Sequence, residues 1–192
     1  MFLGLTVHQQ HGFYGGPWAA ALMGAENIPG IVISQAARNI PHMFLTLSAT
    51  YVGIAQGAYD FTVQYLRGEI PRAQGSKSRQ HSAKQYTVAE MFIKLEQIRA
   101  LFIRSIHEIM VNPEKPARLR AYASQFTTME GAVDICRLAV RTFGGRSMLK
   151  TYPLKRMYRD SRCGSLMFPW TAEACLDRLG RETLYEKGET DD

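Results

Sequence analysis

The chain has 192 residues, of which 46% are apolar and 21% are charged, a balance typical of one globular domain with a substantial core. No run approaches the ~18 consecutive apolar residues of a membrane span, and the apolar N-terminus lacks the basic flank of a secretory signal. The net charge of +6 does not indicate nucleic acid, because the basic residues are spread along predicted helices without interleaved aromatic residues or a recognisable motif.

Three cysteines, Cys136, Cys163 and Cys175, are odd in number and lack the spacing of a redox or metal motif. Free thiols of this kind are typical of a reducing compartment, so we expect a cytoplasmic protein with no membrane partner. The five histidines show no metal-binding spacing either. We therefore expect no metal site.

Residues 1–36 differ in character from the rest of the chain. Two short β-like runs, at 3–7 and 30–34, are separated by glycine-rich sequence. Two isolated strands cannot cover their own faces and edges, so we expect this segment to be partly ordered at best.

From Arg38 onward the pattern predicts helices. Apolar residues recur every three or four positions from 38 to about 66, and the glycine-, proline- and serine-containing stretch 68–78 predicts a loop. A second long helix is predicted over 79–111, and the Asn112-Pro113 pair that follows ends it.

A third long helix is predicted from Pro116 or Ala117 to Thr142, followed by shorter helices over about 154–161 and 171–186. The tail, 188–192, is polar and we expect it to fray. Long helices with short connections predict a mostly α protein, built as an antiparallel helical bundle with a short β-like N-terminal segment.

A glycine corner follows the third helix. The apolar-periodic segment stops at Phe143-Gly144-Gly145, as a helix with a left-handed C-terminal cap does. Tyr152-Pro153 then starts the next helix, with proline at a position that a first turn tolerates. The corner is followed by Arg159-Asp160-Ser161-Arg162 and, further on, by Thr171-Ala172-Glu173.

This order of motifs resembles the C-terminal helical domain of acyl-CoA dehydrogenases and of the flavin monooxygenases with the same fold. Two further segments agree with it, 53–60 (Gly-Ile-Ala-Gln-Gly-Ala-Tyr-Asp) and 88–100 (Val-Ala-Glu-Met, then Lys-Leu-Glu-Gln-Ile-Arg-Ala). The resemblance covers roughly residues 40–185. It implies that 1–36 is the remnant of a preceding β-domain and that 37–187 is the helical bundle domain.

The resemblance implies an FAD-dependent oxidoreductase that removes hydrogens across Cα–Cβ of acyl-CoA thioesters. In the family this domain contributes to two FAD sites of a tetramer, its own and a neighbour's, so we expect a homo- or hetero-oligomer. Tight glycine turns let backbone approach a phosphate or ribose where a Cβ would collide. The positions that the resemblance assigns to cofactor binding are Arg67, Arg141, Phe143, Gly144, Gly145 and Thr171, with Arg72 as an alternative to Arg67.

The catalytic base is not identified by the resemblance. Most members have a glutamate where this chain reads Met167-Phe168-Pro169-Trp170-Thr171, and some have it near His42; neither stretch contains an acid. Glu173 and His42 are the nearest candidates. For Glu173 a stabilising interaction with its helix dipole is the simpler interpretation.

Two alternatives stay open at the level of the sequence. A flavin monooxygenase-like relative needs no base for an α-proton. A non-catalytic assembly subunit would instead use the bundle to pair with an active homologue.

Overall fold

The computed structural model describes residues 31–70, 79–108, 113–167 and 171–185, and over 31–44 it describes the backbone alone. None of these residues forms a strand, in agreement with the predicted mostly α fold. The elements are α3 (Ile31–Arg67), α5 (Ser82–Glu108), α6 (Lys115–Phe143), the short 3-10 helix η1 (Gly145–Met148), α7 (Leu154–Leu166) and α8 (Ala172–Leu184).

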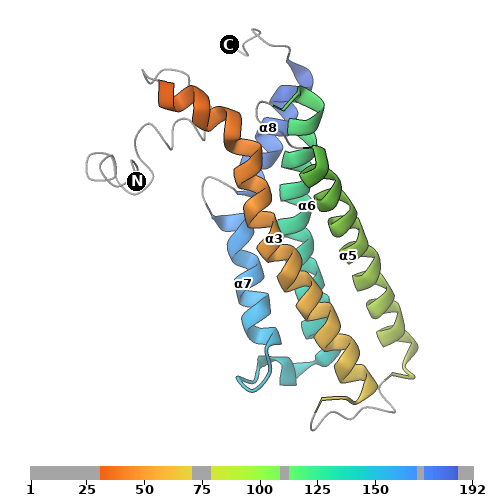
Figure 1. Ribbon diagram of the computed structural model, residues 1–192. Helices are drawn as coiled ribbons and strands as arrows, with labels where there is room; N and C mark the ends of the chain where they lie inside the picture. Colours follow the sequence, from red (N-terminus) through yellow and green to blue (C-terminus); the bar gives the residue numbers. More distant parts are fainter. Residues whose placement is uncertain (1–30, 71–78, 109–112, 168–170, 186–192) are drawn as a thin grey trace.

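The helices form the predicted antiparallel bundle (Figure 1). α3 runs from the upper end of the bundle to its lower end, α5 returns upward and α6 descends again. After η1 at the lower end, α7 and α8 follow one another back up the bundle. α6 is the central helix, because it packs against α3, α5, α7 and α8.

Local sequence sets where the helices begin and end. α6 starts after Glu114 with a proline in its first turn, where the missing N–H costs nothing, and it ends at Phe143 with Gly144 as its C-cap. α8 is preceded by its N-cap Thr171, whose hydroxyl oxygen accepts a hydrogen bond from the Ala174 N–H at 3.2 Å. This side-chain cap satisfies one of the free donors of the first turn.

The core lies where α3, α5 and α6 meet. On α5, Met91, Leu95 and Ile98 recur at helical spacing and are all fully buried. On α6 the apolar residues at helical spacing are buried unevenly. Tyr122, Met129 and Cys136 are buried, whereas four others are only half-buried: Leu119, Phe126, Val133 and Val140. Ser124, Gln125 and Thr128 are fully buried instead, because four helices surround α6 and cover more of its circumference than one apolar stripe.

Two predicted boundaries are corrected. α3 begins at Ile31, seven positions before the predicted start at Arg38, so the β-like run at 31–34 is helical. β-branched residues favour strands only where a sheet partner exists, and here the helix continues through them. α7 extends to Leu166, five positions beyond the predicted end. The first β-like run, at 3–7, lies outside the described residues, and the division of the chain at residue 36 stays a prediction.

Within the described ranges, no helix has the length and apolar character required to cross a lipid bilayer.

Candidate functional site

The glycine corner is a backbone feature at the lower end of the bundle. Gly144 has φ 79° and ψ −161°, a combination that side-chain-bearing residues rarely adopt, and its N–H donates to the Val140 carbonyl at 2.9 Å. A Cβ added at Gly144 or Gly145 would meet no atom within 4 Å. Gly144 is therefore required by conformation, whereas Gly145 leaves open backbone that another molecule can approach.

An aromatic cluster anchors this corner to the end of α3. The Phe143 ring stacks on Tyr65 with centroids 3.7 Å apart, and Phe61 stacks on it at 5.7 Å. Tyr152, just before α7, meets the same ring edge-on at 4.9 Å. Phe143 is buried, so its side chain positions the corner while the glycines that follow it stay exposed.

Arg67, one of the residues assigned to cofactor binding, lies at the C-terminal end of α3 beside a hollow. The volume of this hollow is about 540 Å³, and its walls come from α3, α5 and the residue Arg79 before α5. Its lining is Tyr59, Val63, Leu66, Arg67, Arg79, Gln85, Val88, Ala89 and Phe92. Two guanidinium groups therefore lie on an otherwise largely apolar wall, and that of Arg67 also makes a 3.9 Å ion pair with Glu69.

The hollow and the glycine corner share one end of the bundle, because Tyr65 stacks on Phe143 and is followed directly by Leu66 and Arg67. Arg79 was missed by sequence reasoning. The signal that could have found it is its position at the predicted start of the second helix, where the chain returns to the end of the first. Arg141 is exposed in the last turn of α6, and Arg72 lies outside the described residues.

Thr171 and Glu173 belong to a different part of the molecule. They start α8, and the whole of α7 separates them from the corner. At ~1.5 Å per residue, the 13 residues of α7 span about 20 Å. Glu173 is exposed in the first turn of α8, where a carboxylate interacts favourably with the helix dipole.

His42 is distant from the corner as well. It lies within α3, 25 positions before Arg67, which corresponds to roughly 37 Å of helix. Its side chain is outside the described part of the structure. One copy of the chain thus gathers Arg67, Phe143, Gly144 and Gly145 at one end and leaves Thr171, Glu173 and His42 well away from it.

Buried ionisable groups offer no activated nucleophile among the described residues. Burial raises the pKa of the Cys136 thiol to about 11 and that of the Cys175 thiol to about 12, so both remain protonated at neutral pH. Burial likewise raises the pKa of Tyr122 to about 12. Over the same described ranges, no three His, Cys, Asp or Glu side chains are grouped so that they could hold a metal ion.

Known proteins with similar sequences cover much of this chain. A putative acyl-CoA dehydrogenase, YdbM of Bacillus subtilis, is 29% identical over 142 residues, which is 73% of this chain and 37% of that protein. The acryloyl-CoA reductase (NADH) of Anaerotignum propionicum is 30% identical over 166 residues, 86% of this chain and 40% of that protein. The chain thus spans about two fifths of the length of these relatives.

A solved structure agrees on the fold. The nitroalkane oxidase of Podospora anserina superposes with a TM-score of 0.70 at 18% identity, over 81% of this chain and 37% of that one. The sequence profile of the acyl-CoA dehydrogenase C-terminal domain matches residues 33–168, more than two thirds of the chain. This match includes α3, α5, α6 and α7 with the glycine corner between the last two, and the chain belongs to the acyl-CoA dehydrogenase family.

Proposed function

We propose that this chain is the C-terminal part of an FAD-dependent oxidoreductase that dehydrogenates acyl-CoA thioesters between Cα and Cβ. The observation that carries the proposal is the exposed corner at Gly144 and Gly145, placed beside a hollow with two arginines in a domain of this family. Two of the similar proteins are named for reactions of acyl-CoA compounds, which supports the substrate class.

The residues at the lower end suit the phosphate-bearing part of FAD. Arg67 and Arg79 supply positive charge for a diphosphate, and the apolar wall of the hollow suits the uncharged part of the molecule. The open backbone at Gly145 allows close approach of a ribose or phosphate. When bound, FAD supplies the acceptor for the hydride that leaves the substrate.

The distance between the glycine corner and Thr171 favours an FAD site that is shared between two subunits. Since about 20 Å of helix separates the corner from Thr171, one copy cannot place both groups around one phosphate. We propose that the corner and Arg67 serve the FAD of a neighbouring subunit, while Thr171, whose hydroxyl still has a hydrogen to donate, serves the FAD of its own subunit. The protein would accordingly work as an oligomer.

A second candidate function is favoured by the missing acid. No carboxylate stands at 167–171, and Glu173 is exposed at a helix start where the dipole accounts for it. Flavin-dependent monooxygenation has no requirement for an α-proton base. An assembly subunit without activity of its own would not need a catalytic carboxylate either.

The test is retention of flavin by the purified chain. After FAD is added and the excess is removed on a desalting column, we expect the visible absorption spectrum of bound flavin. Arg67→Gln combined with Arg79→Gln should weaken retention by about tenfold or more, because two charge-assisted contacts to phosphate are lost. Gly145→Val should abolish it, since the new side chain fills the open approach.

Arg99→Gln combined with Arg137→Gln is the matched control, because it removes the same charge from exposed ion pairs on α5 and α6. A colourless wild-type protein would contradict FAD binding by this chain and leave the assembly role. If flavin is retained, turnover of an acyl-CoA with an artificial electron acceptor distinguishes dehydrogenation from monooxygenation, which requires oxygen and an external reductant.

A further inference from the structure

A second hollow is formed by residues that follow the glycine corner in the chain, along the start of α7. It has a volume of about 680 Å³ and is formed by the segment from Met148 to Arg159. Its lining is Met148, Lys150, Thr151, Tyr152, Pro153, Lys155, Arg156, Tyr158 and Arg159. Neither Gly144 nor Gly145 is part of the lining, so this hollow is separate from the proposed flavin site.

The charged residues that line this hollow are all positive. Four of its nine lining residues are cationic and none is acidic. Arg159 pairs with Asp160 at 2.8 Å, whereas Lys150, Lys155 and Arg156 have no ion pair with any described residue. Cations gathered without counter-charges repel one another, and an anion in the hollow would relieve that repulsion.

The first turn of α7 adds to this imbalance. It contains Lys155 and Arg156 but no acidic residue, and Pro153 at its N-cap provides no side-chain hydrogen bond. Positive side chains at a helix N-terminus oppose the helix dipole and destabilise the helix. Proteins break local rules of this kind mostly at functional sites.

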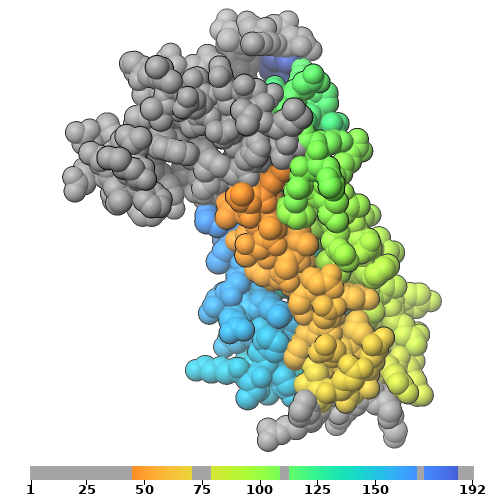
Figure 2. Space-filling model, viewed as in Figure 1, coloured from red at the N-terminus to blue at the C-terminus, as the bar shows by residue number. Residues whose placement is uncertain are grey.

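The lining of this hollow is partly apolar, and one of its residues is held in place by the core. Tyr152 is held edge-on against the buried Phe143 ring, with centroids 4.9 Å apart. Tyr158 is 38% exposed and Met148 is 43% exposed. In Figure 2 the segment that follows the corner forms the light-blue surface at the lower left of the molecule, open to solvent in this view.

We propose that this hollow binds a small molecule with a diphosphate group, held by Lys150, Lys155 and Arg156 beside the N-terminus of α7. Three cations match the charge of a diphosphate, and charge-assisted hydrogen bonds to phosphate oxygens are the strongest that these side chains form. The volume leaves room for an attached planar ring against Tyr152 or Tyr158. This inference does not depend on the proposed enzymatic function.

Isothermal titration of the full chain with inorganic pyrophosphate and with ADP, at one fixed ionic strength, tests the proposal. Both should bind, and Lys155→Gln combined with Arg156→Gln should weaken both by at least about fivefold, because two charge-assisted contacts are removed. This double variant should fold normally, since it also removes the unfavourable charges from the start of α7. ADP binding more tightly than pyrophosphate, by a margin that Tyr158→Ala removes, would identify a nucleotide; equal binding would identify the diphosphate alone.

Two controls separate binding in this hollow from an effect of net charge and from binding at the glycine corner. Arg99→Gln combined with Arg137→Gln changes the net charge equally and should leave pyrophosphate binding intact. Arg67→Gln combined with Arg79→Gln, which removes the phosphate-binding charges of the proposed flavin site, should also leave it intact and so distinguishes the two hollows. The proposal is wrong if neither probe binds. It is also wrong if the Lys155/Arg156 variant and the Arg99/Arg137 variant weaken binding equally, because the effect would then be one of overall charge.

Discussion

Among single residues, Gly144 has the most demanding backbone conformation in the corner. Its φ of 79° combined with ψ of −161° lies in a region essentially reserved for glycine. The space around it is empty, since an added Cβ would meet nothing within 4 Å. The cost of a substitution there comes from backbone strain and not from collision.

We therefore expect Gly144→Ala to lower the free energy of unfolding by about 1–3 kcal/mol. Gly145→Ala is the control, because Gly145 has no positive φ and equally open space; its effect should stay within about 0.5 kcal/mol. Urea denaturation followed by far-UV circular dichroism measures both. Equal losses in the two variants would show that the backbone of Gly144 is no more restricted than that of Gly145.

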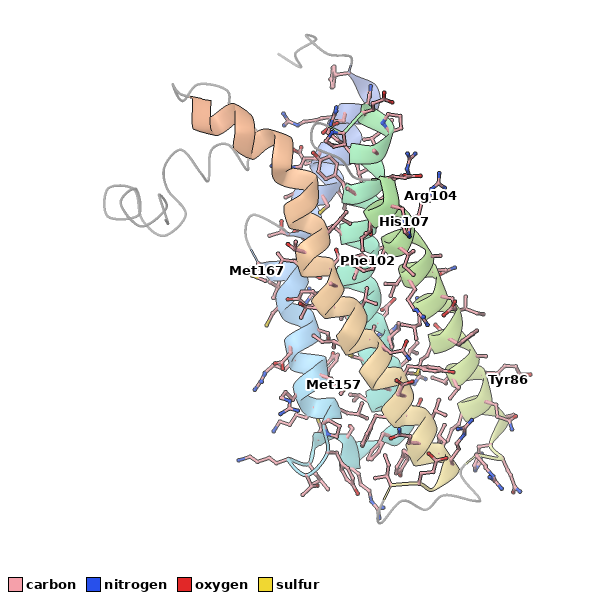
Figure 3. The ribbon with its side chains drawn as sticks, in the orientation of Figure 1. Tyr86, Phe102, Arg104, His107, Met157 and Met167 are labelled. Carbon is pink, nitrogen blue, oxygen red and sulfur yellow. The ribbon has the colours of Figure 1, made fainter. Side chains whose placement is uncertain are left out.

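Among the elements, α5 and α6 are joined by charged contacts as well as by the core. Lys94 on α5 donates to Asp134 on α6 at 3.0 Å. Near the other end, Glu108 of α5 pairs with Arg104 at 2.9 Å and with Arg120 of α6. Figure 3 shows this end of α5, where Arg104 and His107 project close to the top of the bundle.

These ion pairs lower the pKa of the Glu108 and Asp134 carboxyl groups. For Glu108 the main cause is the hydrogen bond from Arg104. For Asp134 burial acts to raise the pKa, but the hydrogen bond and charge of Lys94, with the charge of Arg137, outweigh it. A carboxyl group whose pKa is lower in the folded state stabilises the fold above its unfolded pKa, and this contribution is lost as the pH falls through the folded value.

We expect the free energy of unfolding to decline as the pH is lowered from about 5 to about 3, around the ordinary pKa values of Asp and Glu. Asp134→Asn should make this decline shallower, and Lys94→Met should do the same because it removes the other half of the pair. Denaturant titrations at several pH values measure the slopes. Slopes unchanged in both variants would show that the Lys94–Asp134 pair contributes nothing to the pH dependence.

In the whole molecule, α5 carries a set of exposed apolar side chains that the described part of the chain leaves uncovered. Ile103 is 49% exposed and Ile106 is 46% exposed. Tyr86, at the start of the same helix, projects away from the bundle (Figure 3). Large apolar patches on a protein surface commonly mark an interface with another subunit.

The chain should accordingly self-associate. Ile103→Asp combined with Ile106→Asp should shift it toward monomer, because two charges would have to be buried on association. Leu184→Asp, at an exposed site on α8, should leave the oligomer intact. Light scattering with size-exclusion chromatography reads the mass directly, and a monomeric wild-type protein at micromolar concentration would count against both the association and the shared flavin site.

The sequence determined the helices, their order and the corner. Apolar periodicity placed α5 and α6 to within a few residues, and Phe143-Gly144-Gly145 marked the end of α6, because helix formation and termination depend on neighbouring residues. The motifs also indicated the family. The early start of α3 was missed, since Ile31, Val32 and Ile33 favour a strand when only their neighbours are considered.

Only the tertiary structure decided which helix is central and which charges meet. Periodicity marks one apolar face of α6, but packing against four helices also buries Ser124, Gln125 and Thr128. Arg67 and Arg79 share a wall because α3 and α5 pack side by side, while α7 holds Thr171 about 20 Å from the corner. Contacts between residues distant in the chain depend on how the helices pack, and no local pattern encodes that arrangement.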